Sequence, residues 1–552
     1  MLTTFLIDNM APIMFVSLIF FLLLGYPVAF SLSAVGLAYA WLGIEIGLFT
    51  ENFLGALPGR VLGVMINETL LAIPFFTLMG LILERSGMAE DLIDTIGQLF
   101  GPIRGGLAYA VIFVGALLAA TTGVVAASVI SMGLIALPIM LRYGYDRHLA
   151  TGVIMASGTL AQIIPPSIIL IVLADQLGTS VGDMYRGALV PALVLTLLYA
   201  LYVFFMTLIR PASAPALPPE ARQLNEADGT IGLRSLFALI GITVGSMVGF
   251  YYLIGMAFPG IVAADREIYG SALGVIAGYC LALADRHLGL GMFSRIAQAV
   301  IIVLVPPLAL VFLVLGTIFL GIATPTEGGA MGAVGAILLA MGKKRLSFSL
   351  LSQAIESTAR LSAFVLFILI GARVFALTFY GVNGHVWVEE LLLSIPGGVI
   401  GFLILVNLII FVLGFFLDFF EIAFILIPLI APAAVSLDIN LIWLGVMLAV
   451  NLQASYLTPP FGFALFFMRS VTPDKSYTDK ITGKKIAGIK TADIYRAGIA
   501  FVVLQLIMVG ILVVFPDLVQ MDNSTAQINA AEIKIELPPL GESLELPPLD
   551  LN

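Results

Sequence analysis

The stretch 161–170, AQIIPPSIIL, carries two consecutive prolines inside a long apolar run, and 457–466, LTPPFGFALF, repeats this pattern in the second half of the chain. Proline has no backbone N–H and its ring clashes with the preceding turn, so a proline pair should interrupt an α-helix. An interrupted helix offers carbonyl oxygens to a cation and a helix N-terminus to an anion. A plain proline kink is the alternative for each pair. Because the pair occurs twice, we favour a functional break at 165–166 and at 459–460.

The sequence around these breaks is typical of a membrane protein. Of 552 residues, 61% are hydrophobic and 11% are charged, whereas soluble domains average about 25% charged residues. Apolar runs of about 20 residues, the length that crosses a bilayer, recur from end to end. Runs of this length are too long for barrel strands. We therefore predict an all-α polytopic membrane protein.

We predict about twelve membrane crossings from these runs, at 6–24, 28–43, 60–83, 148–177, 187–209, 236–257, 269–285, 300–320, 324–341, 350–380, 440–468 and 497–516. Two further apolar segments, 105–140 and 397–435, are interrupted by glycine, proline and polar residues. We interpret them as re-entrant hairpins, because this topology places every basic loop on one face. Loops 342–346 and 469–496 are the most basic, so that face is predicted to be cytoplasmic.

The chain also resembles itself. Residues 25–38 align with 321–334, and 144–166 align with 437–460, at nearly constant offsets. The basic loops give the two copies opposite orientations, as in the inverted repeats of secondary transporters. We predict a first inverted repeat with the inner hairpin and the first break at 1–209, and a linker with an extra helix pair at 210–295. A second inverted repeat with the outer hairpin and the second break should follow at 296–516. The acidic, proline-containing tail at 517–552 is either disordered or a docking peptide, and its composition favours disorder.

Polar residues gather near both breaks. Thr122, Ser128 and Ser157 lie near the first break, and their hydroxyl oxygens suit a hard cation such as Na⁺. The alternative is that each hydroxyl bonds to its own helix. In the second half, Asp418 and Glu421 interrupt an apolar segment, and an ionisable group within a membrane span suggests an ion path. If the hairpin tip reaches water, Glu421 could simply be solvated.

Other candidate chemistry is weaker. Arg360 and Arg373 could meet a substrate carboxylate, but snorkelling or pairing with Glu356 is the preferred interpretation. The sequence GTSVG at 178–182 matches a nucleophile motif but lies in a short predicted loop, not between a strand and a helix. The histidines and the single cysteine are scattered, so we expect no enzyme activity, no metal cluster and no cofactor. No basic patch suggests a nucleic acid.

Several motifs together resemble a known family. PVAF, PFFTLMGLILERSG, TTGVVAAS, IIPPS, GIATPTEGGA and LTPPFG follow one another at 27–30, 74–87, 121–128, 163–167, 321–330 and 457–462. In order and spacing they are similar to the large membrane subunit of TRAP transporters, the tripartite ATP-independent periplasmic transporters. The resemblance implies an elevator-type carrier of the ion-transporter superfamily in the bacterial inner membrane. It also implies Na⁺-coupled uptake of an organic anion that a periplasmic binding protein delivers, with a small membrane subunit as partner.

The resemblance also suggests site residues. Carried onto this sequence, it points to Na⁺ ligands at the hairpin tips and helix breaks, at Thr122, Gly123, Ser157, Gly158, Pro165, Gly328, Asp418, Asn451 and Thr458. We assign the solute to neighbouring polar residues, Ser128, Ser167, Thr326, Glu327 and Gln453. The extra pair at 236–285, the long 469–496 loop and the tail depart from the family pattern and leave the small-subunit contact surface open. We expect the small subunit on a separate chain, because no such segment is fused at the N-terminus.

Two alternatives remain from the sequence. A stand-alone Na⁺-coupled anion symporter of the same superfamily would work without a binding protein. A non-transporting scaffold of a membrane complex would account for the acidic tail but not for the paired helix breaks. A channel is disfavoured, because the polar groups cluster at two breaks instead of lining one continuous path.

Overall fold

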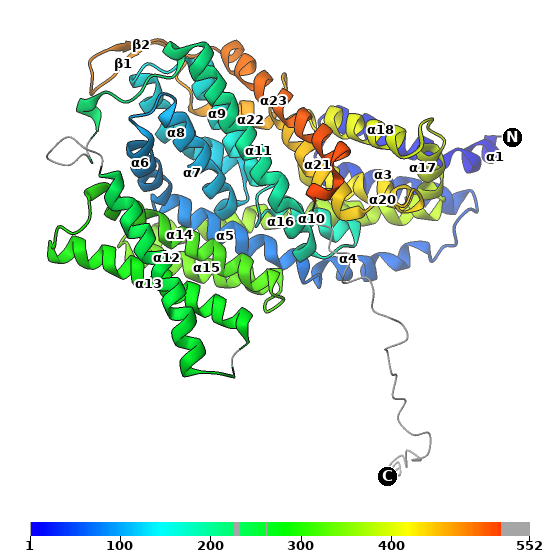
Figure 1. The fold of residues 1–552 in the computed structure, drawn as a ribbon. Coiled ribbons are helices and arrows are strands. Elements are labelled where there is room, and N and C mark those ends of the chain that lie inside the picture. Colours follow the sequence, from blue (N-terminus) through cyan, green and yellow to red (C-terminus); the bar gives the residue numbers. More distant parts are fainter. Residues whose placement is uncertain (1, 223, 225–231, 261, 520–552) are drawn as a thin grey trace, which may run out of the picture.

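A computed structural model describes residues 2–222, 224, 232–260 and 262–519. These residues form 23 α-helices and a single two-stranded hairpin (Figure 1), so the prediction of an all-α membrane protein is confirmed. Most of the expected tail, 520–552, and part of the linker, 225–231, lie outside the described residues.

The first half contains eleven helices, α1 (Leu2–Asp8), α2 (Met10–Leu23), α3 (Val28–Glu45), α4 (Leu57–Met65), α5 (Ala72–Arg85), α6 (Met88–Phe100), α7 (Gly106–Thr122), α8 (Val125–Arg142), α9 (Arg147–Thr159), α10 (Ile168–Leu177) and α11 (Val181–Ile209). An additional pair follows, α12 (Leu233–Ala257) and α13 (Ala263–Leu288). The second half contains α14 (Arg295–Phe319), α15 (Pro325–Gly342), α16 (Phe348–Gly381), α17 (Gly384–Leu393), α18 (Gly398–Leu413), α19 (Phe419–Ile425), α20 (Ile427–Ser436), α21 (Leu441–Tyr456), α22 (Phe463–Val471), β1 (Tyr477–Thr478), β2 (Lys485–Ile486) and α23 (Thr491–Val514).

Among the described helices, eight are long and apolar enough to cross a membrane, or up to eleven if each bent pair is one span. Both numbers are lower than the about twelve crossings predicted from the length of the apolar runs. Some predicted crossings consist of two shorter helices. The segments expected at 148–177 and 440–468 are α9–α10 and α21–α22, and each is interrupted at its proline pair.

One break was not predicted. The segment 60–83, expected as a single crossing, is bent by 49° between α4 and α5. Asn67 lies in the bend, where its side-chain oxygen accepts a hydrogen bond from the backbone N–H of Thr69 at 3.0 Å. Asparagine disfavours a helix interior because its side chain competes for backbone hydrogen bonds in this way. The corresponding helix of the second half, α16, runs unbroken for 34 residues.

Helices from the two halves of the chain pack on one another. Helix α3 packs along α16, and α15 packs along α5. At these contacts a Cβ on Gly36 would lie 2.9 Å from the backbone of Phe375, and one on Gly332 would lie 2.5 Å from the sulfur of Met79. Small residues permit this close helix approach. Each half therefore supplies one glycine-bearing helix to the other.

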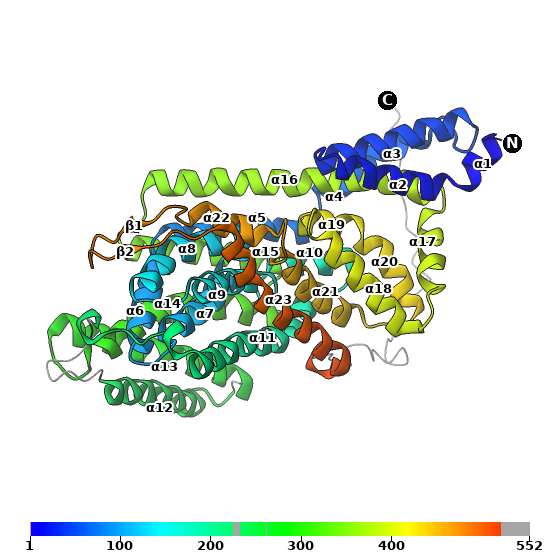
Figure 2. The same ribbon diagram turned by 90° about the horizontal axis from the view of Figure 1, so that it is seen from above.

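The additional pair α12–α13 stands out from the rest of the molecule (Figures 1 and 2). The two helices pack closely on each other: a Cβ on Gly274 would lie 2.4 Å from the backbone nitrogen of Met247. A small core that includes Leu236, Leu239 and Ile296 joins the pair to the start of α14. The outward face of α12 remains apolar and exposed, as expected for a helix that faces lipid.

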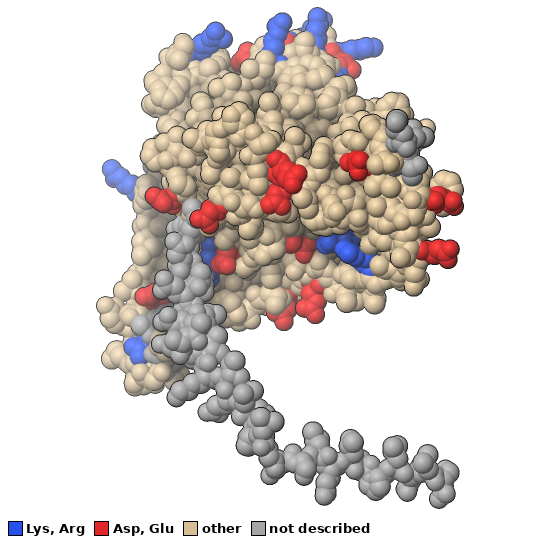
Figure 3. Space-filling model, turned by 90° about the vertical axis from the view of Figure 1, so that its right-hand side faces the viewer, with Lys and Arg blue, Asp and Glu red and all other residues tan. Residues whose placement is uncertain are grey.

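The two ends of the molecule differ in charge. Helix α16 runs along one side from the end that carries β1 and β2 to the end that carries α17 (Figure 2). The β1–β2 end contains the basic loop 472–490, whereas Figure 3 views the α17 end and shows acidic side chains scattered over it, with a basic group in a hollow. This distribution supports, by the positive-inside rule, a cytoplasmic β1–β2 end.

Candidate ion and solute sites

The first candidate site is the junction between the α7–α8 hairpin and the first helix break. The hairpin turns at Gly123, which has the left-handed φ of +60° that glycine adopts at little cost. A Cβ on Gly123 would lie 3.2 Å from Cγ1 of Ile168 and 3.4 Å from the carbonyl oxygen of Pro166. The hairpin tip thus contacts the break directly. Gly158 approaches the second helix of the hairpin, α8, where its Cβ would lie 2.4 Å from Val129.

Hydroxyl groups surround this junction and are buried. The hydroxyls of Thr122 and Ser128 lie 2.9 Å apart across the hairpin tip. The Ser167 hydroxyl donates to the carbonyl of Gln162 at 2.8 Å and caps α10. Thr122 and Ser157 also bond to carbonyls of their own helices, at 2.9 and 2.7 Å, as the alternative interpretation of the sequence expected. Their oxygens keep lone pairs for a further partner.

Gln162 is the unsatisfied group of this junction. It ends the short 3₁₀ turn η3 (Leu160–Gln162) before the prolines and is fully buried, yet neither its Oε1 nor its Nε2 has a hydrogen-bond partner. A buried amide without partners costs about 1–3 kcal/mol, so such groups call for an explanation. A bound ion or solute group at the junction would supply the missing contact.

The second candidate site is the corresponding junction in the other half. Asp418 precedes α19, caps it by accepting from the N–H of Phe419 at 2.7 Å, and accepts a hydrogen bond from the Tyr456 hydroxyl. Glu421 completes the cap by accepting from the N–H of Asp418 at 2.9 Å. A Cβ on Gly414 would lie 2.2 Å from the Ser455 hydroxyl, so this tip also contacts the helix that leads to the second break.

Asn451 and Thr458 flank this second junction. The Asn451 amide donates to the carbonyl of Asn407 at 2.7 Å and so joins α21 to α18. Asn407 itself has a buried side-chain oxygen without a partner. The Thr458 hydroxyl donates to the carbonyl of Ala454 at 2.9 Å, one turn before the prolines. The second junction therefore carries a carboxylate, whereas the first is built from neutral groups.

A third polar cluster lies between the junctions. The Gln453 amide donates to the hydroxyls of Thr159 and Tyr199, at 3.1 and 3.2 Å, and the Gln505 amide donates to the same Tyr199 hydroxyl at 2.8 Å. All four residues are buried, and the side-chain oxygens of both glutamines lack a partner. The cluster joins α9, α11, α21 and α23, which come from both halves.

Three predicted residues lie apart from these sites. Thr326, Glu327 and Gly328 are in the first turns of α15, which packs on α5 and α14. Thr326 donates to the carbonyl of Glu68 at 2.6 Å, and Glu327 caps its own helix through the N–H of Thr324 at 2.8 Å. A Cβ on Gly328 would meet Ile318 at 2.9 Å, so this glycine serves helix packing.

Seven polar residues of these sites were not predicted from the sequence, and these are Thr159, Gln162, Tyr199, Asn407, Ser455, Tyr456 and Gln505. An offset of 294 residues relates Thr159 to Gln453, and it also relates Gln162 to Tyr456. Applying the repeat offset to every polar residue near the breaks would have found these two pairs. Among the described residues, no group of three or more His, Cys, Asp and Glu side chains could hold a metal ion.

Broken helices that meet hairpin tips in both halves define a class, the multi-pass membrane transport proteins with paired discontinuous helices. Comparison with known proteins gives the family. Residues 15–518 match the model of the tripartite ATP-independent periplasmic transporter, DctM component. The chain therefore belongs to this family of transporter permeases, which is not an enzyme family, and is a multi-pass protein of the bacterial inner membrane.

Individual relatives differ in the solute that they are named for. The chain is 29% identical to the C4-dicarboxylate TRAP transporter large permease protein DctM of Pseudomonas aeruginosa, over 78% of this chain and 83% of the relative. It is 24% identical to the sialic acid large permease SiaM of Vibrio cholerae, over 81% and 86%. It is 23% identical to the isethionate permease protein DctMQ of Oleidesulfovibrio alaskensis, over 84% and 61%. TRAP systems in general also include a small membrane subunit and a periplasmic binding protein.

Proposed function

We propose that this chain imports an organic anion across the inner membrane by a secondary active, Na⁺-coupled elevator mechanism. The observation that carries this proposal is the pairing of a hairpin tip with a helix break in each half, within a chain of the TRAP permease family. Such junctions are where secondary transporters bind coupling ions, near the middle of the membrane.

The oxygen atoms available as ligands at the two junctions suit Na⁺ as a co-transported ion. At the first junction, the hydroxyls of Thr122 and Ser157, the carbonyl of Pro166 and the Gln162 amide oxygen would form a neutral, oxygen-rich site. At the second junction, Asp418, Asn451 and Thr458 add a negative charge. Binding of Na⁺ would neutralise part of that charge and favour approach of the anionic solute.

The solute class follows from the relatives, which are named for C4-dicarboxylate, sialic acid and isethionate. All three are small organic anions with a carboxylate or sulfonate. We expect a periplasmic binding protein to deliver the solute and a separate small membrane subunit to accompany this chain. Ser128 and Ser167 present hydroxyl groups at the first junction and are our candidates for polar solute contacts there.

The test is uptake into proteoliposomes that contain this chain and its small subunit. Succinate, N-acetylneuraminate and isethionate are supplied with and without a Na⁺ gradient and with and without the cognate binding protein, and solute-dependent entry of radiolabelled Na⁺ is measured. Uptake that needs both the gradient and the binding protein is the expected result. Na⁺-driven uptake without the binding protein would favour the stand-alone symporter, and absence of any flux from a folded preparation would favour the scaffold.

A further inference from the structure

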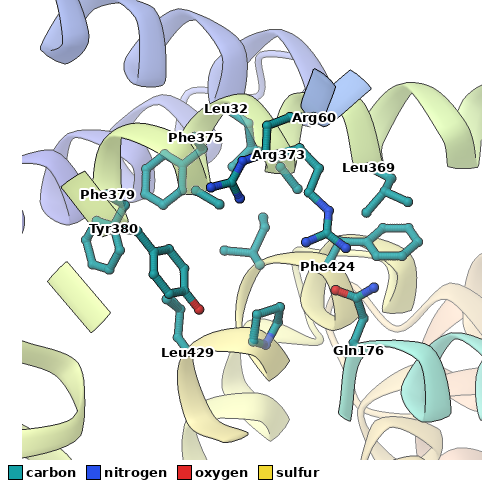
Figure 4. A pocket seen from close by; sticks show the side chains of 14 residues that line it. Leu32, Arg60, Gln176, Leu369, Arg373, Phe375, Phe379, Tyr380, Phe424 and Leu429 are labelled. Carbon is teal, nitrogen blue, oxygen red and sulfur yellow. The ribbon is translucent and has the colours of Figure 1, made fainter. Parts of the chain in front are cut away.

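A cavity of about 290 Å³ separates α16 and α4 from α10, α19 and α20. Figure 4 shows the side chains of Arg60 and Arg373 reaching into it from the α4 and α16 side, with Gln176 on the α10 side and apolar side chains such as Phe375 and Leu429 around them. Pockets for small molecules span about 300–1,000 Å³, so this cavity suits a small ligand. None of the residues assigned from the sequence as Na⁺ or solute ligands lines it.

The two arginines lack partners in the described part of the chain. Neither guanidinium forms a hydrogen bond there, and no carboxylate lies within 4.0 Å of either one. Arg360, thirteen positions before Arg373 on the same helix, instead pairs with Glu356 at 2.7 Å and is well exposed. The pairing with Glu356 that the sequence suggested is therefore formed by Arg360. Arg373 faces the cavity instead.

Nearby acidic side chains do not neutralise the charges of Arg60 and Arg373. Asp175, beside Gln176, accepts hydrogen bonds from the Asn67 and Gln176 amides, at 2.9 and 2.7 Å, and its side chain is not part of the cavity wall. Tyr380, which does line the cavity, stacks its ring on His385 with centroids 4.5 Å apart. Arg373 is partly buried and Arg60 is exposed at the mouth of the cavity. Two like charges at one cavity repel each other, and an anion between them would reduce that repulsion.

The cavity is also lined by α10 and α19, the helices that begin at the two junctions and would move in the proposed elevator mechanism. Helix α10 begins directly after the first break, and Gln176 near its end lines the cavity. Phe424 and Ile425, at the end of α19, form another wall, and α19 begins at Asp418 of the second junction. The arginines come from α4 and α16, which lie on the opposite wall. An anion in this cavity would therefore contact both junction-bearing segments and the long helix beside them.

We propose that this cavity binds the carboxylate or sulfonate of the transported anion, with Arg60 and Arg373 as its two cationic ligands. The proposal rests on the proposed import function and names the recognition element for its substrate class. Guanidinium groups bind such oxyanions through two parallel hydrogen bonds, and the apolar walls suit the carbon skeleton. A lipid phosphate has the same chemistry, so the experiment must separate a free solute from a lipid headgroup.

The experiment measures equilibrium binding of radiolabelled succinate, N-acetylneuraminate and isethionate to the full chain with its small subunit. The complex is held in nanodiscs of phosphatidylcholine or of phosphatidylglycerol. The variants are Arg60→Gln, Arg373→Gln and the corresponding lysine substitutions, and Arg360→Gln is the matched control on α16. Melting temperatures of all variants are compared, and the lysine variants retain the charge if a glutamine variant fails to fold.

We expect each glutamine substitution to raise the dissociation constant of the bound anion by about tenfold or more, because a charge-assisted hydrogen bond is lost. The lysine variants should lose less, and Arg360→Gln should match the wild type. The same pattern is expected in both lipids. The proposal is overturned if the cavity variants match Arg360→Gln, if they differ from it only in phosphatidylglycerol, or if the wild type binds none of the three anions.

Uptake by the same variants, reconstituted with the small subunit into proteoliposomes and supplied with the binding protein, separates this proposal from the proposed function. Transport by the wild type with unchanged affinity in the arginine variants would overturn the cavity assignment alone. Arginine-dependent binding without Na⁺-driven uptake would overturn the transport mechanism and leave the binding site in place.

Discussion

The side chain of Gln453 donates a hydrogen bond to the hydroxyl of Thr159 at 3.1 Å, although the two residues lie 294 positions apart. The same offset separates Pro165 from Pro459, so the contact joins equivalent positions of the two halves. Tyr199 and Gln505 complete the cluster from α11 and α23, the helices that follow the two broken segments. The helices that lead to the two breaks are thereby held together at one buried point.

Replacing Gln453 with leucine tests this link. The Oε1 of Gln453 has no partner, and the remaining three residues keep the Tyr199–Gln505 hydrogen bond. We therefore expect the free energy of unfolding to change by no more than about 1 kcal/mol, since an unsatisfied buried oxygen is removed along with the bonds. We expect the maximal uptake rate to fall without a change in KM, because the two broken segments lose their connection.

Gln505→Leu is the matched variant for this prediction, because Gln505 has the same side chain, burial and unpaired oxygen but lies on α23. Both variants should behave alike in thermal unfolding, but Gln505→Leu should retain the uptake of the wild type, because the hydrogen bond between Gln453 and Thr159 remains. A raised KM that is confined to Gln453→Leu would show instead that Gln453 contacts the solute.

A second prediction concerns Gly123 at the tip of the inner hairpin. Alanine in a left-handed conformation costs about 1–2 kcal/mol, and at Gly123 its Cβ would also lie 3.2 Å from Ile168. Gly178 has a similar φ of +67° but open space around it. We expect Gly123→Ala and Gly178→Ala to lose similar stability, and only Gly123→Ala to lose Na⁺-dependent uptake. Equal uptake by the two variants would show that close contact between tip and break is not needed.

The sequence predicts the two helix breaks because the proline pairs at 165–166 and 459–460 recur at an offset of 294 residues. Proline removes a helical hydrogen bond, but a proline pair alone does not end a helix, since Pro306 and Pro307 lie inside the continuous helix α14. The bend near Asn67 is harder to foresee, because a single asparagine is tolerated in many helices and this one bends where its amide reaches Asp175 in a distant helix.

Side-chain partners depend on packing that the sequence does not reveal. Arg360 and Arg373 lie on one helix with similar neighbours, yet one pairs with a glutamate one turn away and the other faces a cavity closed by α19 and α20. Thr326 and Glu327 lie beside a polar break in the sequence. Helix α15 packs along α5, however, and there Thr326 contacts Glu68 and not either junction. The repeat offset of 294 residues, by contrast, relates Thr159 and Gln453, which are hydrogen-bonded to each other in the fold.

A third prediction concerns Asp418. Asparagine can still accept the hydrogen bonds from Phe419 and Tyr456 but carries no charge. We expect Asp418→Asn, and separately Thr458→Val, to raise the Na⁺ concentration for half-maximal uptake by about tenfold, the size of one lost charged contact. Expression and membrane insertion should remain near normal.

Asp438→Asn is the control for Asp418→Asn, because Asp438 lies in an exposed turn between α20 and α21 and asparagine tolerates its positive φ. The control should retain the Na⁺ dependence of the wild type. If Asp418→Asn and Thr458→Val also retain it, the second junction is not a Na⁺ site.

A fourth prediction concerns the 472–490 loop, which lies outside the membrane-spanning segments. Hydrogen bonds from the hydroxyl and the N–H of Thr482, at 2.7 and 2.8 Å, and the ion pair with Arg142 lower the pKa of Asp479 from 3.8 to about 2. Because the folded pKa is below the unfolded value, this contribution to stability is fully present above about pH 4 and is lost as pH falls towards 2.

The loop should therefore become susceptible to pepsin as the pH falls from about 4 to about 2. Gel analysis of limited digests gives the fraction cut within 472–490. Asp479→Asn, which cannot regain the charge, should be cut to a similar extent at both values. A wild-type loop that is equally resistant at both pH values would mean that Asp479 does not hold it in place.

The last prediction tests the opposite orientation of the two halves. Asp146 caps α9 and Asn440 caps α21 by the same pair of backbone hydrogen bonds, and both residues are exposed. In a Cys280→Ser background, which removes the sole native cysteine, Asp146→Cys and Asn440→Cys each lose an equivalent cap worth about 1 kcal/mol. The two variants are thus matched in the helix cap that they lose, although Asp146 also contacts the His148 ring at 3.2 Å. Because basic loops predict a cytoplasmic Asp146 and a periplasmic Asn440, a membrane-impermeant maleimide added to intact cells should label Asn440→Cys alone. Labelling of both variants, or of Asp146→Cys alone, would contradict the inverted arrangement, and labelling of both after membrane disruption would show that each cysteine is reactive.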